Sequence, residues 1–124
     1  MNIKRKISDI VGEKLFKGKA IVLIGARQVG KTTLLHDLFQ HRNDVLWLNG
    51  DELETRTLLR SITVEKYRAM FGKNKIVVID EAQRIADVGL KSKLITDNFS
   101  DIQLILTGSS SIDLSNKVKE PLTG

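Results

Sequence analysis

The sequence predicts an α/β fold of three layers, in which helices cover both faces of a mainly parallel sheet. Four short apolar runs, at residues 20–24, 45–48, 76–79 and 102–106, have the length and composition of strands that are buried on both faces. Stretches with apolar residues at helical spacing separate these runs. Strands that alternate with helices indicate a parallel sheet, because the chain must cross back over the sheet between parallel neighbours.

The first half of the chain is predicted to place two helices around the first strand. Apolar residues recur at helical spacing between residues 3 and 11, which indicates an amphipathic helix. A Lys-Gly-Lys turn at residues 17–19 leads into the first strand, and a loop at residues 25–30 follows it. Apolar residues between 34 and 39 then mark the inner face of the next helix.

Between the second and third strands, residues 52–71 are predicted to be helical with a break near Ser61 to Thr63. Thr63 is a candidate N-cap of the second half of this region, and Gly72 is a candidate terminator. Val64, Tyr67 and Phe71 share one face of that second half.

Before the fourth strand, residues 82–98 are predicted to form a further helix with an interruption near Gly89. Leu90, Leu94 and Ile95 lie on one side of it.

Length and composition are those of one domain with a single core. The chain has 124 residues, a net charge of +5 and no cysteine, which excludes disulfides and zinc sites with cysteine ligands. No basic block and no array of aromatic residues supports nucleic-acid binding, which stays possible. No apolar run approaches a membrane span and no signal peptide is visible, so we expect a cytoplasmic protein.

The loop after the first strand matches the phosphate-binding P-loop pattern of two glycines, four residues apart, before Lys and Thr. Backbone N–H groups of such a loop and the following helix N-terminus surround a phosphate. Lys31 is expected to reach the β- and γ-phosphates, Thr32 to bind Mg²⁺, and Thr33 to lie near the α-phosphate. The predicted phosphate loop comprises Gly25, Ala26, Arg27, Gln28, Val29 and Gly30.

The third strand ends in two acidic residues, the form of a Walker B motif. Asp80 is expected to hold Mg²⁺, directly or through water, and Glu81 to orient or deprotonate the attacking water. Alone, two acids after a strand more often begin a loop or cap a helix. A P-loop about 50 residues earlier in the chain favours the functional interpretation.

Hydroxyl residues follow the fourth strand. In P-loop ATPases with a catalytic Glu, this strand lies between the other two motif-bearing strands, so its end faces the γ-phosphate. Thr107 and Ser109 are therefore candidates for sensing that phosphate and positioning water, and a hydroxyl-rich turn is the alternative. Asn49, at the end of the second strand, is a hypothetical restraint on Glu81.

Three segments together resemble the prokaryotic AAA-type ATPases of the "AAA domain 14" group. They are residues 25–35 (GARQVGKTTLL), 79–84 (IDEAQR) and 106–111 (LTGSSS), and residues 113–124 match that group as well. The resemblance implies a P-loop NTPase fold of the ASCE class with strand order 5-1-4-3-2, and ATP with Mg²⁺ as ligands. In relatives of this broad class the base often packs near the N-terminal segment, which makes Ile7 and Ile10 candidates for that contact.

The resemblance also implies a longer parent protein. Related chains usually continue past the position of Gly124 with a fifth strand, a lid and a C-terminal domain, so residues 1–124 are expected to be the ATPase part of such a chain. Catalysis by a homo-oligomer, with an arginine from a neighbouring copy, is possible. The alternatives to an ATPase are a nucleotide-gated binding module with negligible hydrolysis, and a P-loop kinase.

Overall fold

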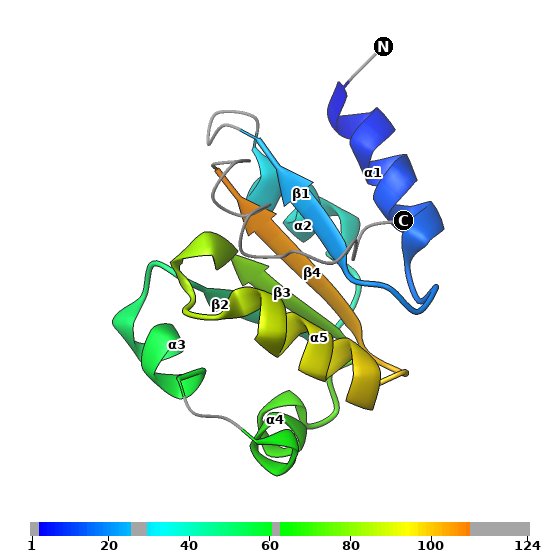
Figure 1. Ribbon diagram of the computed structural model, residues 1–124. Coiled ribbons are helices and arrows are strands. Elements are labelled where there is room, and N and C mark those ends of the chain that lie inside the picture. The colour runs from blue at the N-terminus through cyan, green and yellow to red at the C-terminus, as the bar shows by residue number, and fades with distance from the viewer. Residues whose placement is uncertain (1–2, 26–29, 61–62, 110–124) are drawn as a thin grey trace.

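Four parallel strands form one sheet in the computed structural model, which describes residues 3–25, 30–60 and 63–109 (Figure 1). The strand order is β1-β4-β3-β2, and every neighbouring pair is parallel. The strands are β1 (Ile21–Ile24), β2 (Val45–Asn49), β3 (Ile76–Asp80) and β4 (Gln103–Gly108). The predicted α/β class is confirmed, and β4 lies between β1 and β3 as expected.

Helices cover both faces of the sheet, and Figure 1 shows α2 and α5 on opposite sides of it. Successive side chains of a strand point to opposite faces, so Leu104 and Leu106 enter one core and Ile105 enters the other. The first core lies under α4 (Val64–Phe71), the 3₁₀ turn η2 (Ala82–Arg84) and α5 (Val88–Asn98), and Leu59 enters it directly after α3 (Leu53–Leu58). The second lies under α1 (Ile3–Lys14) and α2 (Lys31–Leu38).

The predicted break between two helices after β2 is confirmed. The Thr63 hydroxyl accepts a hydrogen bond from the Lys66 backbone N–H at 3.3 Å, which caps α4. Gly72 ends the helix with a φ of 53°, a conformation that favours glycine. Tyr67 and Phe71 are buried in the first core, as their shared helix face predicts.

The interruption predicted for the helix at residues 82–98 is present, but its predicted position is wrong. The interruption lies at residues 85–87, between η2 and α5, whereas Gly89 is inside α5. Leu90 is 71% exposed, and the residues of α5 that are buried are Val88, Ser92 and Ile95. Burial of Ile85 and Val88 explains the break, because the chain turns there to bring both side chains into the core.

The fourth strand is longer than the sequence predicts. β4 extends through Thr107 and Gly108, and all six of its residues are buried. Thr107 therefore belongs to a central strand rather than to the turn after it. None of the helices within residues 3–25, 30–60 and 63–109 is both long and apolar enough to span a membrane.

Candidate functional site

The two predicted motifs meet at the carboxyl end of the sheet. Ile24 is paired in register with Gly108, and β3 lies on the other side of β4, so the ends of β1, β4 and β3 are adjacent. The Gly25 backbone N–H donates to the Gly108 carbonyl at 3.1 Å and fixes the first residue of the P-loop to β4. Ligands commonly bind at this edge of a parallel sheet.

The end of the P-loop becomes the start of α2. Gly30 has φ 71° and ψ 40°, the left-handed conformation that glycine adopts without strain, and its carbonyl accepts the Leu34 N–H at 2.9 Å. Lys31 is the first residue of α2 and is only 9% exposed. Its ammonium donates to the Gly25 carbonyl at 2.7 Å, so the side chain reaches back across the loop. The Lys31 ammonium and the N-terminus of α2 therefore both lie beside the loop, and both favour the binding of an anion there.

The Asp80 carboxylate connects α2, β3 and β4. One oxygen, Oδ2, accepts the Thr32 hydroxyl at 2.9 Å, and the other, Oδ1, accepts the Thr107 hydroxyl. Thr107 is fully buried, and its oxygen also accepts the Glu81 backbone N–H at 3.3 Å. Thr107 thus orients Asp80 from within the sheet, and Thr32 faces it from the helix.

A polar cavity of about 220 Å³ lies between these groups. Glu81 borders it although its side chain is only 6% exposed, and its backbone has φ 50° and ψ 49°. A non-glycine residue in this left-handed region costs on the order of 1–3 kcal/mol and is found most often at functional sites. The cavity is lined by Gly30, Lys31, Thr32, Thr33, Asp80 and Glu81.

Two donors contact one oxygen of the Glu81 carboxylate. The Gln83 side-chain amide donates to Oε1 at 2.8 Å, and the Ser109 hydroxyl donates to the same atom at 3.0 Å. Gln83 is half-buried and comes from η2, whereas Ser109 follows β4. The carboxylate therefore has two neighbours that restrict where it points.

The turn after β2 lies against the backbone of the same acidic pair. The Gly50 N–H donates to the Asp80 carbonyl at 2.7 Å. A Cβ on Gly50 would lie 2.2 Å from the Glu81 carbonyl oxygen, which no side chain can tolerate. Arg56 of α3 holds this turn by donating to the Gly50 carbonyl at 2.9 Å and to the Asp51 carbonyl at 2.8 Å.

Only some of the remaining sequence candidates lie within the described residues. Thr33 is exposed at the wall of the cavity, and Ala26, Arg27, Gln28 and Val29 lie outside the described residues. The Asn49 side-chain oxygen accepts the Asp51 backbone N–H at 2.9 Å, and the proposed restraint of Glu81 by Asn49 stays a prediction. Arg84 is exposed and lies 3.8 Å from Asp51.

Oxygen donors of the kind that Mg²⁺ prefers are present in the site. Adjacent ligands of an octahedral magnesium ion lie about 2.9 Å apart, because each ligand is about 2.0–2.1 Å from the metal. The hydroxyl of Thr32 and Oδ2 of Asp80 are 2.9 Å apart, so this pair fits a shared ion. Within the described ranges no group of three His, Cys, Asp or Glu residues forms an all-protein metal site.

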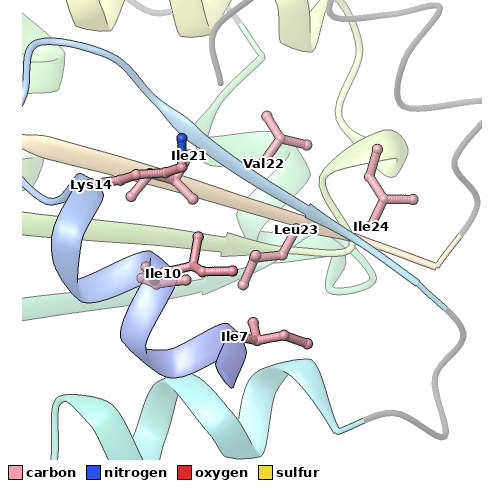
Figure 2. Close-up of a pocket in the computed structure, with 8 residues that line it drawn as sticks. Ile7, Ile10, Lys14, Ile21, Val22, Leu23 and Ile24 are labelled. Carbon is pink, nitrogen blue, oxygen red and sulfur yellow. The ribbon is translucent and has the colours of Figure 1, made fainter. Parts of the chain in front are cut away.

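A second, apolar cavity of about 290 Å³ lies between α1 and β1 (Figure 2). Ile7 and Ile10 line it from the helix, and Leu23 and Ile24 line it from the strand. Because Ile24 directly precedes Gly25, the cavity extends to the residue before the P-loop. Its other lining residues are Val11, Lys14, Ile21 and Val22.

Sequence reasoning missed two residues of this site, Gln83 and Gly50. Gln83 lies two residues after Glu81, and the 3₁₀ turn η2 brings the two side chains together. That turn was not predicted from the sequence. Gly50 follows the second strand, and nothing local indicates that it touches residues 30 positions later.

Among proteins of known sequence, the chain is 34% identical over 130 residues to an uncharacterized protein of Methanocaldococcus jannaschii, covering 90% of this chain. It is 28% identical over 122 residues to the tRNA modification GTPase MnmE of Pelagibacter ubique, covering 97% of this chain. The chain spans 27% of the length of each of these relatives.

Two solved structures share the fold. A Walker-type ATPase of Pyrococcus abyssi superposes with a TM-score of 0.69 and 21% identity, covering all of this chain and 51% of that one. A Pif1 helicase, from a structure that describes DNA unwinding at forked double-stranded DNA, superposes with a TM-score of 0.54 and 14% identity. The match covers 88% of this chain and 33% of that one. The model of the AAA domain family matches residues 17–124. With the P-loop, the acidic strand end and the strand order described above, this match shows that the chain belongs to the AAA domain family of P-loop proteins.

Proposed function

We propose that this chain binds ATP with Mg²⁺ and hydrolyses it, as the motor part of a longer protein that couples hydrolysis to a partner domain. One observation carries the proposal: a single cavity is bordered by Lys31, the Thr32–Asp80 pair and the Glu81 carboxylate. These are a phosphate-binding cation, a pair of oxygen ligands and a base, which together are the parts that phosphoryl transfer to water needs.

Lys31 and the N-terminus of α2 would hold the β- and γ-phosphates of ATP. The Lys31 ammonium would exchange its contact with the Gly25 carbonyl for phosphate oxygens, which are stronger acceptors. Bound Mg²⁺ would neutralise phosphate charge. Thr32 and Asp80 would hold that ion, and Thr107 would keep Asp80 in position through its hydroxyl.

Glu81 would orient the attacking water and accept its proton as the water oxygen bonds to the γ-phosphorus, while the bond from that phosphorus to the bridging oxygen breaks and ADP leaves. Its carboxylate borders the cavity, and its partners Gln83 and Ser109 contact only Oε1 in the hydrogen bonds described above. Ser109 would thereby act through Glu81, and its position at the end of β4 also suits a phosphate sensor.

The base of the nucleotide would lie in the apolar cavity between α1 and β1. Ile7, Ile10 and Ile24 supply the apolar surface that a planar base needs, next to the start of the P-loop (Figure 2). Replacing Ile7 by Ser should weaken ATP binding several-fold and leave the binding of inorganic triphosphate unchanged. Equal effects on both ligands would contradict this assignment of the base.

Adenine or guanine is a separate question, because one relative is named a GTPase. The family match supports ATP, and competition of unlabelled ATP and GTP against a fluorescent nucleotide decides between them. Tighter binding of GTP would assign the chain to guanine nucleotides with the same phosphate chemistry.

Binding and hydrolysis are tested by separate variants. Lys31→Ala should weaken Mg·ATP binding by about ten- to hundredfold, because a charge-assisted contact of about 1.5–3 kcal/mol is lost. The exposed Lys66→Ala is the matched control. Glu81→Gln should retain binding and abolish single-turnover phosphate release, whereas the exposed Glu65→Gln should leave both binding and release unchanged. Removing Mg²⁺ with EDTA should abolish release in every variant.

The two alternative hypotheses, a nucleotide-gated binding module and a kinase, predict different products. A nucleotide-gated module would bind Mg·ATP and release no phosphate, and a kinase would transfer phosphate only when an acceptor is added. If the rate per molecule rises with protein concentration, a neighbouring copy contributes to the site, as expected for catalysis completed by an arginine in trans.

A further inference from the structure

We propose that Gln83 is a positioning residue for hydrolysis, which holds the Glu81 carboxylate at the wall of the phosphate cavity. The inference rests on the proposed function, in which Glu81 activates water. It adds a residue that neither motif contains, and it assigns the role to the 3₁₀ turn η2.

Glu81 and Gln83 differ in their position relative to the phosphate cavity. Glu81 is one of the residues that line the cavity, whereas Gln83 is not among them. Its amide nitrogen is 2.8 Å from Glu81 Oε1, within the range of a well-formed hydrogen bond. Gln83 therefore acts on the carboxylate without needing to touch nucleotide.

The geometry of the turn η2 places Gln83 beside Glu81. Glu81 has a left-handed backbone, and the chain enters η2 immediately afterwards. The Arg84 N–H donates to the Glu81 carbonyl at 3.1 Å, which closes the turn and brings the side chain of Gln83 beside that of Glu81. The backbone of Gly50 also lies close to the Glu81 carbonyl, so the backbone of Glu81 is held independently of its side chain.

The two donors to the Glu81 carboxylate come from different parts of the fold. Ser109 donates to the same oxygen from the end of β4, at 3.0 Å. Ser109 follows a strand of the sheet, whereas Gln83 belongs to the turn that carries Glu81 itself. Two donors from different elements thus hold Oε1 of Glu81, which fixes the orientation of the carboxylate. A displacement of about 1 Å in such a group can lower a rate about hundredfold.

The experiment compares ATP affinity with single-turnover phosphate release. Gln83→Met keeps the length of the side chain and removes the donor, and Gln83→Glu keeps its shape and replaces the donor by an oxygen. Both variants should lose at least tenfold in the rate of phosphate release, with the dissociation constant for Mg·ATP within twofold of wild type. Gln83→Glu should be the slower, because its carboxylate repels Glu81.

Gln103→Met is the matched structural control. Gln103 is 2% exposed and donates to the Lys19 and Leu104 carbonyls, so the same substitution there removes buried hydrogen bonds away from the cavity. It should lower the unfolding temperature, with the rate per folded molecule unchanged. Gln83 variants that release phosphate at the wild-type rate would overturn the proposal. So would variants that lose stability and nucleotide binding together without a separate loss of rate.

A second readout needs no turnover. The side-chain amide of Gln83, assigned by its loss from the NMR spectrum of Gln83→Met, should shift in Glu81→Ala and stay in place in Glu65→Gln. If the wild-type chain binds Mg·ATP but releases no phosphate, the hydrolysis step of the proposed function fails, and the amide signal still decides about Gln83. An unmoved signal in Glu81→Ala would overturn the positioning role, and a shifted one would retain it.

Discussion

At the scale of single residues, the conformation of Glu81 depends on what its neighbours lack as well as on what they donate. Its left-handed backbone is unfavourable for a glutamate, and it is retained because the surroundings determine it from several sides. Gly50 contributes by having no side chain, and Gln83 and Ser109 contribute by donating hydrogen bonds. Acidic residues at the end of a strand become a candidate catalytic pair only in this setting.

Gly50→Ala should destabilise the protein by about 1–3 kcal/mol, because the new methyl group would overlap the Glu81 carbonyl and force the turn to move. Gly12→Ala is the matched control, since a Cβ there meets nothing within 4 Å and the position lies in α1. It should raise stability by up to about 1 kcal/mol. Urea unfolding of both variants measures the difference. Equal effects would show that the contact with Glu81 is not tight.

Thr107→Val keeps the shape of the side chain and removes the hydroxyl that Asp80 accepts. The free energy of unfolding should fall by about 1–3 kcal/mol, because Oδ1 of the half-buried Asp80 carboxylate loses the Thr107 hydroxyl and keeps only the Glu81 backbone N–H of the two donors. The exposed Thr57→Val in α3 should change it by less than about 0.5 kcal/mol. The concentration of Mg²⁺ needed for half-maximal ATP binding should also rise in Thr107→Val, whereas an unchanged requirement would separate Thr107 from the metal site.

At the scale of elements, α4 is held by aromatic packing rather than by polar contacts. Tyr67 stacks on Phe71 with ring centroids 5.6 Å apart, and Phe99 of the chain after α5 meets both rings edge-on. The Tyr67 hydroxyl is buried without a hydrogen-bond partner in the described part of the chain. A hydroxyl in such a place contributes little that a phenyl ring would not contribute.

Tyr67→Phe should therefore leave stability at neutral pH unchanged or raise it by up to about 1 kcal/mol. Burial raises the pKa of Tyr67 from 10.0 to about 12, so the folded protein holds this proton more tightly than the unfolded chain. The stability linked to that proton is complete below pH 10 and is lost as pH rises toward 12.

The variant should lose less stability than wild type across this alkaline window. Urea unfolding at neutral pH and within the window measures both effects. The chain has one tyrosine, so tyrosinate absorbance reports Tyr67 directly. Ionisation near pH 10 in the folded protein would contradict the burial of this hydroxyl.

At the scale of the whole molecule, the two cores share one sheet and should unfold together. Strands β3 and β4 contribute alternate side chains to both cores, so neither core can be lost without disturbing the strands of the other. Trp47 is the only tryptophan in the chain, and it packs against the core under α1 and α2, with His36 stacked on its ring at 3.8 Å. Its fluorescence therefore reports on one face of the sheet.

Leu104→Ala and Ile105→Ala change adjacent residues of β4 that enter opposite cores. Each should destabilise the protein by about 2–5 kcal/mol, and each should shift the Trp47 unfolding transition to lower urea by a similar amount. Circular dichroism should give the same midpoints as fluorescence. A Trp47 transition that is insensitive to Leu104→Ala would show that the two faces unfold independently.

The local sequence was sufficient to predict a feature wherever the residues of one segment specify that feature by themselves. Short, mainly apolar runs predict the four strands. Strands β3 and β4 are almost entirely buried, whereas β1 and β2 are largely half-buried. The P-loop and the Asp80–Glu81 pair could be identified for the same reason, since spacing along the chain is part of their chemistry. Thr63 and Gly72 mark the ends of α4 through backbone preferences of single residues.

Only the tertiary structure decided which residues surround Glu81. The contacts from Gly50 and Ser109 join positions about 30 residues apart, and they depend on the order of the strands rather than on any local pattern. The break before α5 is likewise set by burial of Ile85 and Val88, which overrides the helical period. The sequence by itself thus determined the strands and the two motifs, whereas packing determined how the Glu81 carboxylate is held, because that depends on neighbours that only folding brings together.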